Sequence, residues 1–401
     1  MENISPTLLC KDIIQTRKKQ NLPIINFGLG ENPIKQPSLF IEALHTHADK
    51  KFYTSSEGIP ELNQTLKNIY HTKNTEYDIL LGNGLKELLF IIQLAFVGKI
   101  FHITPSWVSY KEQINILNKN DDLIEIKTTF QNKYKINLEH LDNTLQEYNT
   151  YNKIIIFNNP NNPLGIAMSN TEIKQLAQVF KKNNCLVIAD EIYLNLTYQK
   201  ISSISKYIPD LTIRCSSISK DLGCGGYRLG WLGFPKTQQA LFKKCKNLAS
   251  SMYSCTCTPI QYATNSILTH KSVIAQHFTI STKIYKLIAK KVCTILAKHN
   301  IDFIKPNACW YLFVNFDKYR NQLAPHNIHN SADLCLYLLN SIGFVSVGGE
   351  SFNCTGLNLR LSLVDFDVVI HEKNNTYENL NIARIITGIN MLCQKIEELV
   401  K

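Results

Sequence analysis

The middle of the chain alternates short apolar runs with a segment of helical periodicity. Residues 153–157 (KIIIF) and 185–189 (CLVIA) are rich in β-branched and aliphatic side chains, which favours strands buried on both faces. Between them, Ser169 and Glu172 have the spacing of a capping box, and apolar side chains follow at positions 173, 176, 177 and 180. Strand, helix and strand in this order predict a right-handed βαβ unit and therefore a parallel sheet.

Other periodic patterns flank this unit. Residues 86–97 have the dense apolar pattern of a helix, and Gly98 follows it, where we expect the C′ glycine. From about residue 271 onward the chain changes character, because long helical patterns surround only a few strand-like pieces. This change predicts a second, α+β domain. The helical patterns cover residues 272–299, 332–339 and 382–399, and the strand-like pieces cover residues 310–315 and 357–363.

The composition is that of a globular protein. Hydrophobic residues make up 44% of the chain and charged residues 19%, which excludes a disordered or fibrous protein. The net charge is +11, but the lysines and arginines are scattered and form no basic tract interleaved with aromatic residues, so we expect no nucleic-acid partner. The longest apolar stretch, residues 88–97, is far shorter than the ~20 residues of a membrane-spanning helix, so we expect no membrane partner.

The cysteines and histidines do not predict a metal site. The chain has 12 cysteines but no Cys-x-x-Cys pair, and its paired histidines have no Cys, Asp or Glu at the spacing of metal ligands. The N-terminal residues lack the basic and apolar regions of a secretory signal. We therefore expect a cytoplasmic protein with reduced thiols and no metal.

Polar residues follow three consecutive predicted strands. In open α/β sheets, ligands bind at the carboxyl ends of the strands, so we expect these residues to meet. Taken singly, Asn-Pro pairs are usually turns and lone charged residues usually face solvent. The glycines before Arg228 lack the G-x-G-x-x-G spacing, so a dinucleotide site is not indicated. Asn162 follows the first strand in NNPNNPLG, Asp190 and Tyr193 follow the second, and Lys220 and Arg228 follow a strand-like run at 212–216.

Together these side chains meet the chemical needs of pyridoxal phosphate. This cofactor requires a lysine amine that bonds to its aldehyde, and a carboxylate that keeps its pyridine nitrogen protonated so that the ring accepts electrons. It also requires donors for its 3′ oxygen, and an arginine, hydroxyls or backbone N–H groups for its phosphate. Lys220, Asp190 and Arg228, with the polar residues around them, supply these groups.

On these motifs the chain resembles the class I pyridoxal-phosphate-dependent aminotransferases of fold type I, and in particular the bacterial aspartate aminotransferases. The resemblance runs from about residue 5 to residue 360. It implies an α/β fold whose large domain, residues 45–274, has three αβα layers and a mostly parallel sheet. Residues 1–44 and 275–401 would form a smaller α+β domain. It also implies pyridoxal 5′-phosphate as the cofactor, and a homodimer with its active sites at the interface.

The resemblance implies roles for the residues around the cofactor ring. Lys220, in Ser-Ile-Ser-Lys, matches the catalytic lysine that forms the Schiff base. Asp190 matches the partner of the pyridine nitrogen, and Tyr193 and Asn162 match the donors to the 3′ oxygen. Trp107 matches the aromatic residue that stacks on the ring.

The phosphate-binding positions match as well. Ser217 and Arg228 correspond to phosphate ligands of the family. Gly84, Leu85 and Lys86 lie where the family has its phosphate loop, at the start of the helix predicted from residue 86. These matches imply a phosphate held between that helix and the lysine segment.

A third group of matches concerns the substrate and the second subunit. Arg360 corresponds to the arginine that clamps the substrate α-carboxylate, and Gly30, Trp107 and Asn162 correspond to residues beside the substrate. Tyr53 corresponds to a tyrosine that reaches the phosphate site of the partner subunit.

The implied reaction is transamination, in which an amino group moves from an L-amino acid to a 2-oxo acid. In the matching subgroup, a lysine at the position of Lys86 reads the distal carboxylate of acidic substrates, and a segment matching residues 5–7 (SPT) folds over the site. We therefore expect aspartate or glutamate in one half-reaction. One departure is residues 347–350 (VGGE), which replace a Val-Pro-Gly pattern and predict a looser loop near the substrate.

Other functions remain as alternatives. An aromatic amino acid aminotransferase is one, because Trp107 and Tyr110 offer an apolar wall. A β-eliminating lyase with the same cofactor is another, because the core residues serve the cofactor and not the leaving group. We do not expect a DNA-binding regulator. Such proteins carry an added DNA-binding domain before this fold, and here the match begins near residue 5. An inactive scaffold is disfavoured by the presence of Lys220, Asp190 and Arg360.

Overall fold

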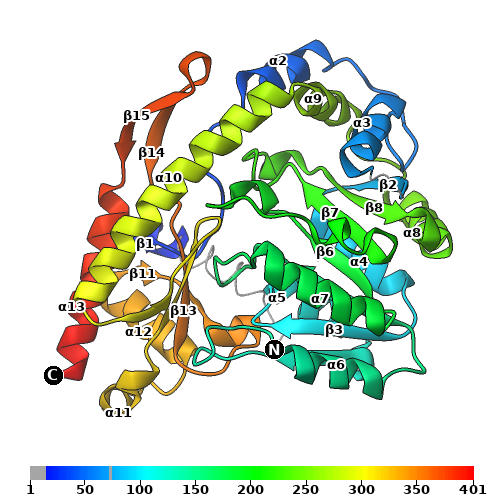
Figure 1. The fold of residues 1–401 in the computed structure, drawn as a ribbon. Helices are drawn as coiled ribbons and strands as arrows, with labels where there is room; N and C mark the ends of the chain where they lie inside the picture. The colour runs from blue at the N-terminus through cyan, green and yellow to red at the C-terminus, as the bar shows by residue number, and fades with distance from the viewer. Residues whose placement is uncertain (1–14, 72–74) are drawn as a thin grey trace.

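The computed structural model of the protein describes residues 15–71 and 75–401. Its larger part is built on a seven-stranded sheet of order β2-β8-β7-β6-β5-β3-β4 (Figure 1). Neighbouring strands are parallel except at β8, which is antiparallel to both β2 and β7. The strands are β2 (Tyr77–Gly82), β3 (Lys99–Thr104), β4 (Leu123–Lys127), β5 (Lys153–Asn158), β6 (Leu186–Asp190), β7 (Thr212–Ser217) and β8 (Gly230–Pro235).

Helices cover both faces of this sheet. On one face, Leu88 of α4 and Phe242 of α8 belong to one buried apolar cluster with the strands. On the other face, Leu141 of α6 and Leu176 of α7 belong to a second cluster. The arrangement is the three-layer αβα architecture expected from the sequence. The helices of this part are α2 (Ser38–Thr46), α3 (Pro60–Tyr70), α4 (Leu85–Ala95), α5 (Val108–Ile116), α6 (Leu138–Glu147), α7 (Asn170–Lys182), α8 (Gln239–Tyr253) and α9 (Thr258–Thr269).

The predicted βαβ unit is confirmed as β5, α7 and β6, and the two strands pair in parallel. The capping box at the start of α7 is also confirmed. The Ser169 hydroxyl accepts the Glu172 N–H at 3.3 Å, and the Glu172 carboxylate accepts the Ser169 N–H at 2.8 Å. Two of the N–H groups that a helix leaves without intrahelical partners are therefore satisfied within four residues of chain.

The helix predicted over residues 86–97 is confirmed as α4, but its end was predicted wrongly. The helix stops at Ala95 and Phe96 is its C-cap, so Gly98 lies beyond the C′ position. The glycine serves a close approach instead. Its φ is +140°, and a Cβ atom there would lie 2.3 Å from the Asn152 carbonyl oxygen. The chain enters β3 at this point, and a side chain at residue 98 would collide with the Asn152 carbonyl.

A smaller α+β part packs beside the large sheet. It contains a four-stranded antiparallel sheet of order β12-β13-β10-β9, and β1 pairs in parallel with β11. The three late helical patterns are confirmed as α10, α12 and α13. The elements are β1 (Ile25–Asn26), β9 (Asp302–Ile304), β10 (Tyr311–Asn315), β11 (Phe344–Val345), β12 (Val347–Gly348), β13 (Asn358–Ser362), β14 (Asp367–His371), β15 (Thr376–Asn381), α10 (Lys271–Lys298), α11 (Arg320–Leu323), α12 (Ser331–Ile342) and α13 (Ala383–Val400).

The long helix α10 connects the two parts. It begins beside α2 and α9 and runs diagonally to α13, past the β14–β15 hairpin (Figure 1). Ile284 and Ile288 of α10 lie in the same buried cluster as Leu361 of β13. Within the described ranges, none of the helices combines the length and the apolar character that crossing a membrane would need.

We predict that Ser169→Ala lowers the free energy of unfolding by about 1 kcal/mol, because the Glu172 N–H loses its acceptor at the start of α7. Urea denaturation followed by circular dichroism measures this change. Ser341→Ala is the control, since its hydroxyl bonds back to the Tyr337 carbonyl on an exposed helix surface and caps no N–H group. Equal stability of Ser169→Ala and wild type would contradict the prediction.

Candidate active site

A cavity of about 560 Å³ lies at the carboxyl ends of β5, β6 and β7. The strand register brings these ends together, because Asn158 pairs opposite Asp190, and Asp190 pairs opposite Cys215. Strands from the smaller part and the α4 start close the other sides. The predicted site residues that line it are Gly30, Leu85, Lys86, Trp107, Asn162, Asp190, Tyr193, Lys220, Arg228 and Arg360.

Lys220 extends its amine into this cavity. The Nζ atom donates a hydrogen bond to the Gly30 carbonyl oxygen at 2.8 Å. Removal of the amine from water and the nearby positive charge of Arg360 together lower the pKa of Lys220 from 10.5 to about 8. A minor fraction of this amine is therefore neutral, and able to accept a proton, near neutral pH.

Asp190 is a buried carboxylate at the end of β6. The Tyr110 hydroxyl donates to its Oδ2 atom at 2.5 Å, and the Ile192 N–H donates to its Oδ1 atom at 3.2 Å. Burial raises the pKa of Asp190 to about 6, although the Tyr110 hydrogen bond acts in the opposite direction. Sequence reasoning gave Tyr110 a place in an apolar wall for substrates. In the structure its hydroxyl is directed to Asp190, and Tyr110 lines the cavity together with Trp107.

Two phenols meet on another side of the cavity. The hydroxyls of Tyr193 and Tyr311 lie 2.9 Å apart, and the Tyr311 ring also faces the Arg360 guanidinium, with 4.9 Å between its centroid and Cζ. Sequence reasoning missed Tyr311. Its place in the predicted strand at 310–315 was visible, but nothing in that pattern indicated that this strand borders the site.

Arg360 is buried in β13 with few partners. Its Nη1 atom donates to the Asn162 Oδ1 atom at 3.3 Å, and its Nη2 atom donates to the Gly28 carbonyl oxygen. Among the described residues, its Nε atom has no hydrogen-bond partner and no carboxylate forms an ion pair with it. A buried guanidinium with an unused donor is suited to bind an anionic group of a ligand.

Arg228 and the start of α4 form a cationic end of the cavity. Arg228 has left-handed backbone geometry (φ 57°), which is uncommon for a residue with a side chain. Its Nη2 atom donates to the Asn83 carbonyl oxygen at 2.9 Å. Gly84 permits this approach, because a Cβ atom there would lie 2.2 Å from Nη2. The guanidinium and the free N–H groups of the helix together favour an anion.

Lys86 and Trp107 stand next to each other at the cavity wall. The Lys86 Nζ atom lies 5.1 Å from the centroid of the Trp107 ring, which is within the range of a cation–π contact. Partial burial lowers the pKa of Lys86, while the carboxylate of Glu112 acts in the opposite direction. An anionic ligand group would compensate the desolvation of this amine.

Some predicted residues are not at the cavity. Tyr53 is 89% exposed on the surface of this chain. The Ser217 hydroxyl is buried and accepts the Ser219 N–H at 3.1 Å, and it is Ser219 that lines the cavity. The segment at residues 5–7 lies outside the described residues.

The loop at residues 347–350 is held more firmly than the sequence suggested. Val347 and Gly348 form β12, with Val347 paired opposite Arg360. The Glu350 carboxylate accepts the Ser331 N–H at the start of α12, at 2.7 Å. Strand pairing and the hydrogen bond to the start of α12 therefore restrain this loop.

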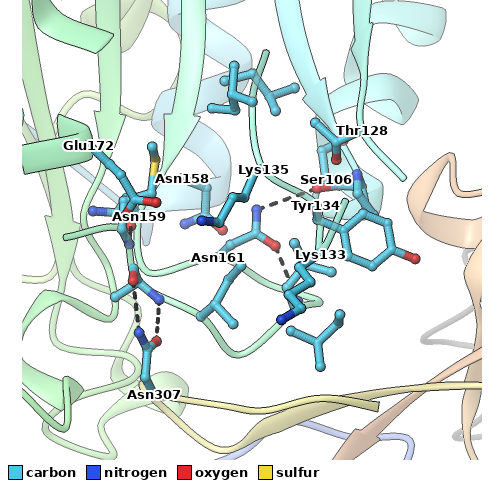
Figure 2. Close-up of a pocket in the computed structure, with 18 of the residues that line it drawn as sticks. Ser106, Thr128, Lys133, Tyr134, Lys135, Asn158, Asn159, Asn161, Glu172 and Asn307 are labelled. Atoms are coloured by element: carbon cyan, nitrogen blue, oxygen red, sulfur yellow. Dashed lines mark hydrogen bonds between the residues drawn. The ribbon is translucent and has the colours of Figure 1, made fainter. Parts of the chain in front are cut away.

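A larger cavity of about 1080 Å³, drawn in Figure 2, adjoins the smaller one. It shares Tyr110 and Asn158 with the smaller cavity. Asn161 and Asn307 line the larger cavity and form hydrogen bonds to backbone groups. The amines of Lys133 and Lys135 point into this cavity in Figure 2. Its described lining does not include Lys220, Asp190 or Arg360. We therefore place the chemistry in the smaller cavity.

Comparison with known proteins agrees with this geometry. The sequence profile described as "Aminotransferase class I and II" matches residues 23–368. The chain belongs to this family. It is therefore a transaminase.

Curated relatives of this aminotransferase match over most of their length. The aspartate aminotransferase of Sulfolobus acidocaldarius is 25% identical over 360 residues, which cover 86% of each chain. The probable aspartate/prephenate aminotransferase of Aquifex aeolicus is 25% identical and covers 98% of this chain and 96% of the relative. The asparagine–oxo-acid transaminase of Streptococcus mutans is 28% identical and covers 92% and 95%.

Solved structures share the fold of the aminotransferase. The aspartate aminotransferase of Thermotoga maritima superposes with a TM-score of 0.80 at 22% identity, and that of Thermus thermophilus with maleate has a TM-score of 0.81 at 19% identity. Both comparisons cover 98% of this chain and 97% of the other.

We predict that an amine-directed acylating reagent modifies Lys220 of the cofactor-free aminotransferase with a pH midpoint near 8, because the neutral amine is the nucleophile and its pKa is about 8. Mass mapping of the Lys220 peptide between pH 6 and 11 measures this. Arg360→Met should move the midpoint upward, since one neighbouring positive charge is removed. A wild-type midpoint at ~10.4, the value of an unperturbed lysine, would show that the amine is not desolvated.

Proposed function

We propose that this aminotransferase binds pyridoxal 5′-phosphate in the 560 Å³ cavity and transfers amino groups between an acidic amino acid and a 2-oxo acid. The observation that carries the proposal is one cavity lined by Lys220, by the buried carboxylate of Asp190 and by the buried guanidinium of Arg360. A lysine amine, a desolvated carboxylate and an unpaired guanidinium are costly to bring together unless ligands use them.

The donor set fits the cofactor. Lys220 would be its covalent attachment point, and Asp190 would face the pyridine nitrogen. A cationic ring nitrogen would favour the ionised form of Asp190, whose pKa is raised to about 6 without it. Tyr193 and Asn162 would donate to the 3′ oxygen, and Trp107 would cover one face of the ring. When bound, pyridoxal phosphate supplies an aldehyde for the amine and a ring that accepts the electron pair released at Cα.

The cationic end of the cavity would hold the phosphate. Arg228 would contribute charge, and the start of α4 at Gly84 and Leu85 would contribute N–H groups. Ser219 lines the cavity in this structure, while the Ser217 hydroxyl is turned to the backbone, so Ser219 is a further candidate for a phosphate contact.

The remaining residues account for the chemistry of the substrate. Arg360 would bind the substrate α-carboxylate in a bidentate geometry, which fixes Cα near the Lys220 amine. Lys220 would accept the proton from Cα as a general base and return it as a general acid. Its lowered pKa supports both roles, because the neutral and charged forms then coexist near neutral pH.

Three observations favour an acidic substrate. Lys86 stands at the cavity wall as a partly desolvated cation. The relatives named above include an enzyme for aspartate, and the Thermus enzyme was solved with maleate, a dicarboxylate.

We also propose that the enzyme is a homodimer whose large domain spans residues 45–274. Phe52 and Tyr53 are 79% and 89% exposed, and adjacent exposed aromatic side chains are typical of protein interfaces. Arg228, at the cationic end of the cavity, is also exposed in a single chain. A second subunit that covers this face would shield the phosphate site and bring its Tyr53 near it.

We predict that Lys220 is the attachment point of the cofactor. Borohydride reduction of the protein purified with pyridoxal phosphate should add a phosphopyridoxyl group to the Lys220 peptide in a mass map, because the reduced linkage is stable. Lys220→Ala should lower kcat by at least about 10³-fold while the fold is retained. Borohydride treatment that leaves the Lys220 peptide unmodified would disprove the cofactor site. Pyruvate release from cysteine without an oxo-acid acceptor would indicate β-elimination instead.

We predict that Lys86→Ala raises KM for aspartate and glutamate by about tenfold or more, because a charge-assisted pair worth roughly 1.5–3 kcal/mol is lost. Activity with apolar and aromatic amino acids should change little. Lys243→Ala, on the exposed surface of α8, is the control. A uniform loss across all substrates would mean that Lys86 serves the cofactor, and the acidic-substrate proposal would fall.

A further inference from the structure

The main chain at Lys220 is held by a side chain from a distant part of the sequence. The Asn32 Nδ2 atom donates to the Lys220 carbonyl oxygen at 2.9 Å. The same segment also contacts the other end of the lysine, because Gly30 accepts the hydrogen bond of the Lys220 amine at 2.8 Å. Residues 30–32 therefore form hydrogen bonds with both the backbone carbonyl and the side-chain nitrogen of Lys220.

The amide of Asn32 has only one orientation that satisfies its neighbours. Its Oδ1 atom accepts the Ile34 N–H at 3.0 Å and the Tyr285 hydroxyl at 2.6 Å. A backbone N–H can only donate, and the Lys220 carbonyl can only accept. The oxygen must therefore face Ile34, and the NH₂ group must face Lys220.

Tyr285 brings helix α10 into this contact. It is 1% exposed, and its ring lies 5.2 Å from the ring of Trp310, centroid to centroid. A buried phenol retains a partner for its hydroxyl, and here that partner is Asn32. The position of Asn32, and through it the Lys220 carbonyl, is thus tied to α10.

A second residue of α10 holds the next peptide group. The His277 Nε2 atom lies 3.1 Å from the Asp221 carbonyl oxygen, and His277 is 7% exposed. Burial lowers the pKa of His277 to about 4, so its ring is neutral near pH 7. Because a carbonyl only accepts, Nε2 carries the proton of this neutral ring.

We propose that Asn32, Tyr285 and His277 form a clamp of positioning residues that fixes the main chain of Lys220–Asp221 to α10. The inference rests on the proposed function of Lys220. The amine has to carry a proton between fixed atoms, and a misplacement of about 1 Å can slow such a step ~100-fold. A backbone held at two consecutive carbonyls lets the side chain move while its origin stays in place.

The clamp also connects the lysine to the arginine site. α10 packs in one buried cluster with β13, the strand that carries Arg360. The substrate carboxylate and the proton-transferring amine are therefore positioned against the same helix. A shift of α10 relative to the large sheet would change both positions together.

The test compares single substitutions in the full-length enzyme loaded with its cofactor. Asn32→Ala should lower kcat by about 10- to 100-fold and change KM for aspartate less than threefold, because binding at Arg360 is retained. Asn32→Asp retains the oxygen for Ile34 and Tyr285 but loses the donor to Lys220, so it should be similarly slow. Tyr285→Phe, which is nearly isosteric, should lower kcat about fivefold.

Deuterium exchange of residues 217–224 provides a readout that does not depend on catalysis. It should be faster in Asn32→Ala and Tyr285→Phe than in wild type, in protein with and without cofactor. Tyr198→Phe is the matched control, because it also removes a phenol hydrogen bond, to the Cys309 carbonyl at 2.7 Å, without contacting Lys220. It should leave kcat and the exchange of this segment unchanged.

Two outcomes would overturn the clamp. One is wild-type kcat in both Asn32→Asp and Tyr285→Phe, which would mean that Asn32 serves only its local turn. The other is an equal loss of kcat in Tyr198→Phe, which would reflect general destabilisation. Failure of the proposed function is distinguishable, because wild type itself would then lack transamination and would show no Lys220 adduct after borohydride reduction.

Discussion

The parallel pairing of β5, β6 and β7 is the constraint on which the site depends. Parallel strands end at the same edge of a sheet, and the register places Asn158 opposite Asp190 and Asp190 opposite Cys215. The segments that follow these strands therefore lie next to one another. Because the strands are buried between helices on both faces, the register is fixed by the packing of their side chains, and the carboxylate at the end of β6 is buried with them.

Burial of charge gives this edge its chemistry. Lys86, Lys220, Arg228 and Arg360 all line one cavity, and Asp190 is the buried carboxylate among them. Desolvation and the nearby positive charges lower the pKa of Lys220, while desolvation raises that of Asp190. An anionic phosphate at one end and a carboxylate at the other would relieve this repulsion. The same electrostatics would therefore favour a doubly anionic set of ligands.

The smaller part contributes Arg360 to the site, and it also holds neighbouring site residues in position. β13 carries Arg360 against the β10 strand that carries Tyr311, and α10 reaches the Lys220 backbone through Tyr285 and Asn32. Arg360, Tyr311 and Tyr285 are buried, and each is hydrogen-bonded or stacked, so their freedom is small. A site built between two packed parts in this way can be adjusted by a small shift of one against the other.

The sequence by itself determined many of the helices and strands and indicated the candidate site residues. Local periodicity encodes strands and helices, so β5, α7 and β6 could be predicted. The motifs at the strand ends pointed to Lys220, Asp190 and Arg228, while the family resemblance pointed to Arg360. It could not determine which side chains turn toward them. Tyr110 meets Asp190 across 80 residues, and Tyr285 meets Asn32 across 253 residues. Such pairs depend on how whole helices and strands pack and on the exact direction of each side chain. The same holds for Ser219 in place of Ser217 at the cavity, and for the early end of α4. Spacing along the chain carries no information about contacts that only the tertiary packing creates.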